Sequence, residues 1–264
     1  MNKLDVIKAI EAHHWDYEEE WIPSYIETIE EEGVKATKNP KMHNVLSNKV
    51  VELSIEGSHL MQEQWDKIKK FYGDVPFSLW LEASDSERFT PILEKDGYSV
   101  TDRYDGVAYF LDQYSGEPLI NKNINYIEVK SDEDIRSLVE VSSLIWNYPE
   151  EQQESIFNQR KSYIDSPYRN GGYILALKDS LPVAYSNYRY SSDGNIMFMN
   201  GSGVLAEFRH QGIYSDMVSF RLGHARLKGA LLATCQARQG HSAPVLRKLG
   251  FQKYSTYDYW VYTG

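Results

Sequence analysis

A glycine turn between a strand and a helix is the first place where this sequence can do chemistry. A strand pattern that starts near Asn200 runs into residues 209–214, RHQGIY, and a helical pattern begins directly afterwards. The first N–H groups of a helix have no partner within it and lie at the positive end of its dipole. Gly212 allows an anion to approach the backbone, and Arg209 adds charge. The turn therefore predicts a phosphate or pyrophosphate site.

Two other phosphate-binding motifs fit this stretch less well. Residues 201–206, GSGVLA, match the spacing of the dinucleotide fingerprint G-x-G-x-x-A. That fingerprint requires a helix at its second glycine and an acidic residue about 20 positions later. Here the apolar run continues as a strand through Phe208, and the next strand ends near Cys235 without an acid. The P-loop sequence G-x-x-x-x-G-K-[ST] does not occur.

Hydrophobic periodicity predicts alternating helices and strands around this turn. Helical spacing covers the first 32 residues, and the segment 112–123, DQYSGEPLINKN, is the best linker candidate. We expect strands at 42–55, 76–81, 98–111, 125–129, 172–178, 182–190, 195–208 and 231–237, a strand pair at 251–262, and helices at 58–72, 86–95, 131–146, 150–164, 212–228 and just before Gly250.

An internal repeat indicates two related domains. Residues 78–98, SLWLEASDSERFTPILEKDGY, align without a gap on residues 231–251, LLATCQARQGHSAPVLRKLGF. The identities are few, so chance is the alternative, but strand, helix, glycine and terminal aromatic residue agree in one register. We expect a first domain over 1–120, which includes the N-terminal helices, and a second over 121–264.

Composition excludes several classes of protein. The chain has 264 residues and a net charge of −10, which disfavours an exposed face for nucleic acid. The single cysteine, Cys235, excludes an internal disulfide framework, and the seven histidines show no metal-ligand spacing. No apolar run is long enough to span a bilayer, and the N-terminus is too charged for a signal peptide. We expect a cytoplasmic protein without a metal.

The turn and the segment after it resemble the two signatures of the GNAT superfamily of acyl-CoA N-acyltransferases. Residues 204–214, VLAEFRHQGIY, resemble V-x-P-x-(Y/F)-R-x-x-G-x-(G/A), and residues 239–251, QGHSAPVLRKLGF, resemble N-x-x-(A/S)-x-x-x-Y-x-x-x-G-F. The resemblance covers about residues 125–264. The first half looks like a degenerate copy, because it has LEKDGY but no arginine-glycine loop before its 58–72 helix. It implies an α/β fold: two GNAT-like domains in tandem, each a central mixed sheet flanked by helices.

The resemblance also implies acetyl-CoA as co-substrate. The strand backbone near 202–205 would pair with the pantetheine arm, and the amides of 210–214 would hold the pyrophosphate. Arg238 or Arg247 would meet the adenosine phosphates, although a solvated helix face fits either equally well. The cofactor-binding residues expected are Gly203, Val204, Leu205, Arg209, His210, Gln211, Gly212, Ile213, Tyr214 and Gln239.

The catalytic residues are not defined by the sequence. Leu246 stands where many GNAT proteins place a tyrosine that protonates the leaving thiolate. Asn200 and Ser202 are candidates to orient a water, and Glu207 is the carboxylate of the strand. His224 fits a helix face packed on the core better than a catalytic role.

The leading hypothesis is an acetyl-CoA-dependent N-acetyltransferase, in which an amine attacks the thioester directly. The acceptor would be a small-molecule or peptide amine, and the protein a monomer or homodimer. One alternative is a non-catalytic acyl-CoA-binding or sensor module. Another is a scaffold that binds a partner through its tyrosine-rich surface.

Overall fold

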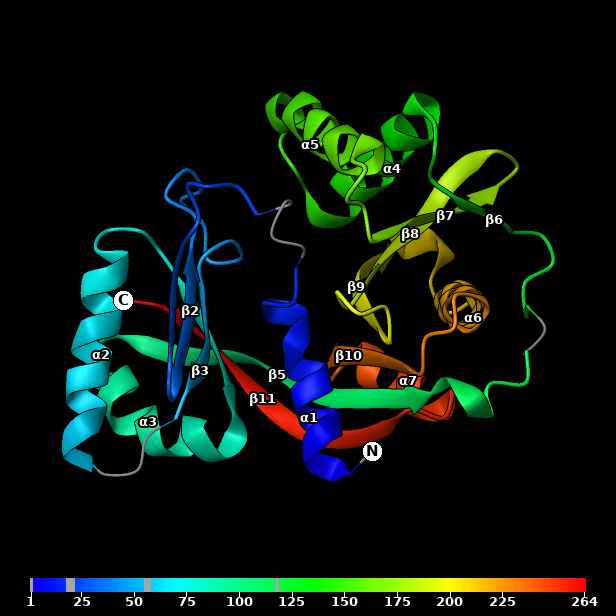
Figure 1. Cartoon of the computed structure of the whole chain (residues 1–264). Coiled ribbons are helices and arrows are strands. Elements are labelled where there is room, and N and C mark those ends of the chain that lie inside the picture. The colour runs from blue at the N-terminus through cyan, green and yellow to red at the C-terminus, as the bar shows by residue number, and fades with distance from the viewer. Residues whose placement is uncertain (1, 18–21, 55–57, 117–118) are drawn as a thin grey trace.

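A computed structural model describes residues 2–17, 22–54, 58–116 and 119–264. In these ranges the chain forms one mixed sheet of eleven strands, flanked by helices (Figure 1). The strands are β1 (Glu27–Glu31), β2 (Val34–Lys38), β3 (Lys49–Leu53), β4 (Ser78–Glu82), β5 (Tyr98–Phe110), β6 (Asn125–Glu128), β7 (Gly171–Lys178), β8 (Leu181–Tyr190), β9 (Ile196–Val204), β10 (Leu232–Arg238) and β11 (Gln252–Tyr262). The mixed α/β fold is thereby confirmed.

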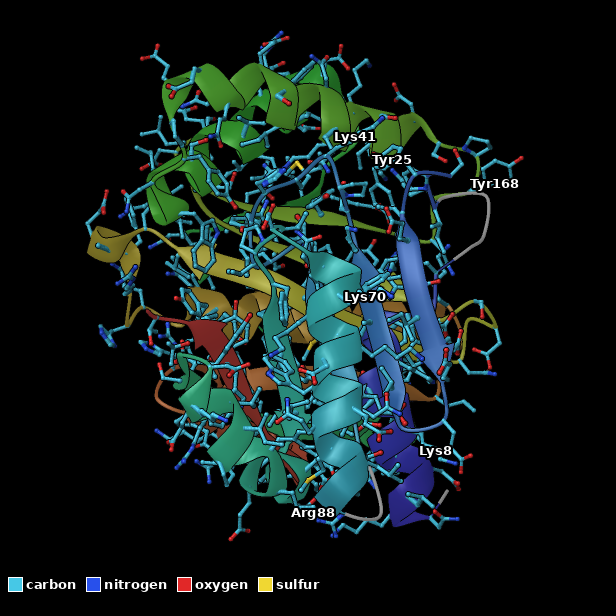
Figure 2. The ribbon with its side chains drawn as sticks, turned by 90° about the vertical axis from the view of Figure 1, so that its left-hand side faces the viewer. Lys8, Tyr25, Lys41, Lys70, Arg88 and Tyr168 are labelled. Atoms are coloured by element: carbon cyan, nitrogen blue, oxygen red, sulfur yellow. The ribbon has the colours of Figure 1, made fainter. Side chains whose placement is uncertain are left out.

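In the same ranges, the structure has eleven helical segments. The α-helices are α1 (Lys3–Glu11), α2 (Ser58–Tyr72), α3 (Ala83–Lys95), α4 (Asp132–Trp146), α5 (Gln153–Asp165), α6 (Ile213–Leu227) and α7 (Ser242–Lys248). Short 3-10 helices are η1 (Ala12–His14), η3 (Leu111–Gln113), η4 (Glu150–Gln152) and η5 (Ala206–Phe208). On the side of the N-terminal half, Lys8 of α1, Lys70 of α2 and Arg88 of α3 are exposed to solvent (Figure 2).

The last strand of each half lies in the sheet of the other half. The strand order is β1-β2-β3-β4-β11-β5-β10-β9-β8-β7-β6, so β5 lies against β10 and β11 lies against β4. The two exchanged strands also pair with each other, antiparallel, along their length. At their crossing Gly106 is needed, because a Cβ there would lie 2.1 Å from Ser255 Oγ. The strands of both halves therefore form one continuous sheet.

Helices cover both faces of the sheet in the C-terminal half. Met197 and Met199 of β9 pack with α6 in one core cluster, which also contains Leu246 of α7. On the other face, Tyr185 contacts Trp146 at the end of α4, and Arg189 contacts the backbone of η1. The signature turn and α6 thus lie on one face, and α1, α4 and α5 lie on the opposite face.

Two predicted elements are wrong. The helix expected over the first 32 residues ends at Glu11 and continues only through η1, and residues 27–31 form the edge strand β1. This strand has a single half-buried apolar residue, Ile29, so its pairing with β2 decides its conformation. The strand pair expected at 251–262 is the single strand β11, because its partners are β4 and β5.

The boundaries expected for two domains fall in a segment that is tied to α6. Near the expected boundary, the buried carboxylate of Asp216 accepts hydrogen bonds from Ile120 N at 2.7 Å and Asn121 N at 2.8 Å. It also accepts one from Tyr126 Oη at 2.9 Å. The division at 120 remains a prediction, but this end of the linker is fixed to the first turn of α6.

Candidate functional site

The parallel strands β9 and β10 pair at their start and then separate. Their pairs are Ile196–Leu232, Met197–Ala233 and Phe198–Thr234, and β10 continues to Arg238 paired only with β5. Beyond Phe198, the edge of β9 that faces β10 has backbone groups without a strand partner among the described residues. An extended ligand can pair with such an edge as an added strand.

A β-bulge lies just beyond the point of separation. Asn200 and Gly201 of β9 together oppose the single residue Asn187 of β8. A bulge leaves a residue out of the ladder and turns its backbone groups away from regular pairing. The open edge of β9 therefore carries an irregular backbone at the position where β9 and β10 diverge.

The signature turn follows directly from this edge. β9 ends at Val204, η5 makes one turn, and α6 begins after Gly212. His210 has φ +62° and Gly212 has φ +82°, both in the left-handed region. No described residue accepts a hydrogen bond from the backbone N–H groups of 210–215. Free amides at the start of α6 are the groups that a pyrophosphate site requires, and its presence here stays a prediction.

The side chains of the turn hold its shape. Arg209 Nε donates to Val204 O at 3.1 Å, and Gln211 Nε2 donates to Glu207 O at 3.1 Å. Both side chains are exposed. A Cβ on Gly212 would lie 3.1 Å from Ile120 Cγ2, so the fixed linker covers one side of the turn.

Of the ten predicted cofactor residues, nine lie on this strand-turn-helix segment, residues 203–214. The tenth, Gln239, follows β10, where its Nε2 donates to Asp105 Oδ1 at 2.8 Å. Tyr214, in the first turn of α6, lies beside Ser242 of α7 and the buried Arg221. Burial raises the pKa of Tyr214 to about 12, so its phenol is protonated at neutral pH.

The predicted catalytic candidates do not form one group. Asn200 lies in the bulge, and Ser202 Oγ donates to the Asn200 carbonyl at 3.2 Å. Glu207 is exposed on η5, outside the diverging strands. Leu246 is fully buried in the core, so the family's tyrosine position provides packing and no acid. His224 packs on Tyr188 and lies 3.0 Å, through Nδ1, from Tyr190 Oη.

Two adjacent histidines that sequence reasoning missed lie over the diverging strands. His13 lies near Phe198 of β9, with tilted rings whose centroids are 6.4 Å apart, and His14 Nε2 is 3.1 Å from Gln236 Oε1 of β10. Because Gln236 Oε1 is an acceptor, His14 Nε2 carries the proton and Nδ1 has the lone pair. Nδ1 is buried and has no partner among the described residues. The signal in the sequence is the pair itself, at the end of the first apolar helix pattern.

Both imidazoles are neutral at physiological pH. Burial, together with the positive charge of Lys49, lowers the pKa of His13 to about 3. Burial also holds the pKa of His14 well below its usual range. A site that disfavours imidazolium also disfavours an alkyl ammonium, because both are buried cations.

The N-terminal half has a similar divergence, and carboxylates gather at it. β3 and β4 pair over two residues, and Glu52 and Glu82 lie beyond that pairing. The pKa of Glu11 is raised to about 7. Burial is the main cause, a hydrogen bond from Tyr257 opposes it, and repulsion by Glu82 and Glu52 contributes to the rise. Grouped carboxylates disfavour the phosphates of a coenzyme.

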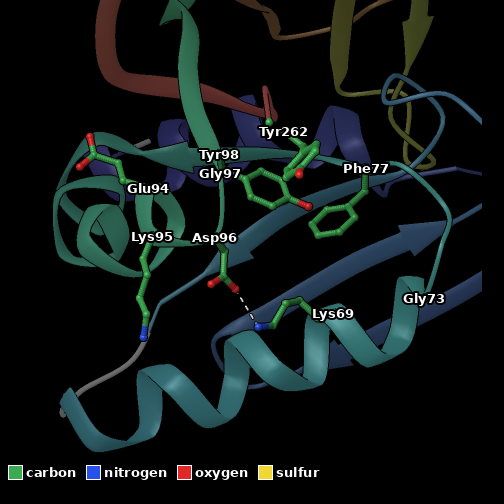
Figure 3. A pocket seen from close by; sticks show the side chains of 10 residues that line it. Lys69, Gly73, Phe77, Glu94, Lys95, Asp96, Gly97, Tyr98 and Tyr262 are labelled. Atoms are coloured by element: carbon green, nitrogen blue, oxygen red, sulfur yellow. Dashed lines mark hydrogen bonds and ion pairs between the residues drawn. The ribbon is translucent and has the colours of Figure 1, made fainter.

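A separate hollow lies between α2, α3 and the ends of β5 and β11 (Figure 3). Its volume is about 630 Å³, and Phe77, Tyr98 and Tyr262 contribute aromatic rings to its wall. The charges in it neutralise each other, because Lys69 Nζ lies 2.7 Å from Asp96 Oδ2. It shares no residue with the signature turn.

Neither a metal site nor a membrane span emerges from the described residues. No cluster of three or more His, Cys, Asp or Glu residues in these ranges could hold a metal ion. No helix in them is both long and apolar enough to cross a membrane.

Comparison with known proteins identifies the fold. No family model and no curated protein matches the sequence. Among solved structures, a GCN5-related N-acetyltransferase from Kribbella flavida is similar with a TM-score of 0.68 and 16% identity, over 90% of each chain. A conserved protein of unknown function from Staphylococcus epidermidis ATCC 12228 gives 0.68 and 16%, over 92% of this chain and 96% of that one.

A tandem GNAT protein from the clavulanic acid biosynthesis pathway is also similar. Its TM-score is 0.64 at 12% identity, over 97% of this chain and 92% of that one. At these identities the likeness concerns the fold. The chain has the fold of the GNAT acetyltransferases, and it shares that fold with a tandem member across almost its full length.

Proposed function

We propose that the C-terminal half is an acetyl-CoA-dependent N-acetyltransferase. The observation that supports this most is the unpartnered amides of 210–215 at the end of a strand whose inner edge is open. In the proposed complex the amides hold the pyrophosphate and the edge of β9 pairs with the pantetheine arm. The thioester then lies near the bulge at Asn200 and Gly201.

The transfer needs a neutral amine. Its lone pair forms the new N–C bond, the C–S bond breaks, and the sulfur leaves with the bonding pair. The nitrogen releases one proton, which water or the departing thiolate takes up, and the products are the amide and CoA. Deprotonating an alkyl ammonium of pKa about 10.4 at pH 7 costs roughly 4–5 kcal/mol. The buried, cationic surroundings of His13 and His14 favour uptake of the amine already neutral, and His14 Nδ1 can accept a hydrogen bond from it. The thiolate, of pKa about 8.5, needs little help in leaving.

A second candidate is a non-catalytic acyl-CoA-binding module. The buried Leu246 in place of a tyrosine favours it, since no acid stands at that position. Turnover separates the two candidates: release of CoA with any amine supports the enzyme, and binding without release over a broad amine panel supports the module.

Thermal unfolding with and without acetyl-CoA tests the shared binding site. Acetyl-CoA at about 100 times its Kd stabilises the wild type by roughly 2.7 kcal/mol. Gly212→Glu places a carboxylate among the amides and abolishes that shift. Gly212→Ala is the matched control: it brings the same left-handed strain, about 1 kcal/mol, without charge, and retains the shift. No shift in the wild type would contradict both candidates.

A further inference from the structure

Arg160 of α5 is a buried guanidinium without an anionic partner among the described residues. Arg160 is only 9% exposed, and its Nη1 atom is buried with no hydrogen-bond partner among the described residues. The rings of Tyr173 and Tyr185 lie 5.7 and 5.9 Å from its Cζ atom. A buried, unpaired guanidinium destabilises the fold, and an anion that binds beside it offsets that cost.

The other buried arginines of this half have structural partners. Arg189 Nη2 donates to the His13 carbonyl at 3.0 Å and Arg221 Nη1 to the Asn187 carbonyl at 3.1 Å, although Arg189 Nε and Arg221 Nη2 also lack a partner among the described residues. Exposed Arg136, on the neighbouring helix α4, lies 3.5 Å from Glu154. Arg160 has no such hydrogen bond to a described residue, which leaves its charge available to a ligand.

Tyr185 connects Arg160 to the bulge. Its hydroxyl accepts a hydrogen bond from Trp146 Nε1 at 2.5 Å, and a Cβ on Gly201 would lie 3.9 Å from that same hydroxyl. The ring of Tyr185 therefore lies against the guanidinium and its hydroxyl lies at the bulge, on the sheet face opposite the signature turn.

An acceptor atom for an amine stands at the bulge end of this path. Asn187 Oδ1 is buried without a partner, and its Nδ2 lies 3.8 Å from the position of a Cβ on Gly201. A carbonyl oxygen accepts a hydrogen bond from an amine N–H. The two unsatisfied groups, Asn187 Oδ1 and Arg160 Nη1, thus favour ligand groups of opposite kind, and Tyr185 lies beside both sites.

We propose that Arg160 binds a carboxylate of the acceptor while Asn187 holds its amine at the bulge. This rests on the proposed transferase function and names its substrate class: amines that carry a carboxylate several bonds away, such as ω-amino acids. The planar guanidinium fits a carboxylate with two parallel hydrogen bonds. Because Arg160 lies against the ring of Tyr185 and Asn187 lies at the bulge beside its hydroxyl, an amine and carboxylate on one carbon fit less well.

A series of ω-amino acids of increasing length tests the spacing between the amine and the carboxylate. The ω-amino acids from glycine to 6-aminohexanoate, each beside its own amide, are assayed with acetyl-CoA for CoA release. They are assayed in parallel, with CoA, for thermal stabilisation. In the wild type, one of the longer acids exceeds its amide by roughly tenfold to a hundredfold in kcat/KM, the range for a charged hydrogen bond. Glycine shows less preference over its amide.

Variants of Arg160 assign that preference to its charge. Arg160→Gln removes the discrimination between acid and amide, and Arg160→Lys retains part of it. Arg136→Gln, which removes an arginine from α4, leaves it unchanged. Urea unfolding of each variant verifies that the fold is intact.

The outcomes separate this proposal from the proposed function. Equal turnover of acids and amides, or a preference that survives Arg160→Gln, overturns the carboxylate site and leaves the transferase standing. Acids that stabilise only proteins with a cation at position 160, without CoA release, support the site and contradict the transferase. If no probe reacts or stabilises while acetyl-CoA still binds, the carboxylate site is rejected.

Discussion

The pH dependence of the free energy of unfolding tests the raised pKa of Glu11. In the folded protein the pKa of this carboxyl is raised to about 7, chiefly by burial, from about 4.5 in the unfolded chain. Below pH 4.5 both states hold the proton. Between pH 4.5 and 7 only the folded state holds it, so the stability from this proton is lost as pH rises through 7. The shift corresponds to about 3 kcal/mol, and partial exposure of the side chain reduces this to about 2.

Replacement of Glu11 by Gln isolates this contribution. The variant keeps a neutral side chain at every pH, so its free energy of unfolding, relative to wild type, rises by about 2 kcal/mol between pH 4.5 and 8. Urea unfolding at several pH values measures both curves. Glu30→Gln, at an exposed site of β1, controls for the removal of one charge. Parallel curves for wild type and Glu11→Gln would refute the reasoning.

Two further substitutions test how the fold holds the site. Asp216→Ala leaves three donors, among them the hydroxyl of Tyr126, without their acceptor, and we expect a loss of about 3 kcal/mol in urea unfolding. Asp216→Asn keeps an acceptor oxygen, so a loss as large as that of Ala would argue against this account. Gly106→Ala places a Cβ 2.1 Å from Ser255 Oγ and lowers the melting temperature by several degrees, whereas Gly240→Ala meets no atom within 4 Å and leaves it unchanged.

The sequence predicts the turn and its helix well because their determinants are local. Gly212 supplies the left-handed cap, and α6 forms at 213–227 against an expectation of 212–228. The strand before the turn is predicted four residues too long. Ala206 and Phe208 are apolar enough to continue the strand. The pairing of β9 with β8 ends at Val204, however, and residues 206–208 form η5.

Features that depend on partners far away in the chain could not be predicted from the sequence. Alternation of apolar residues shows that β5 and β11 are strands, but it does not say that each lies in the other half's sheet. His13 and His14 read as the polar end of a helix until η1 is placed over β9 and β10. Arg160 gives no signal at all, since only the three-dimensional contacts reveal that its charge is unpaired.

The exchange of β5 and β11 has a consequence for the newly made chain. When β4 and β5 leave the ribosome, the strand that belongs between them, β11, is still unmade, and more than half the chain must follow first. Until then both strands present unpaired edges, which invite wrong pairing and aggregation. Because contacts between residues distant in sequence dominate, we expect folding to be slow. We expect chaperones to raise the yield of folded protein most when they act after β11 has been made.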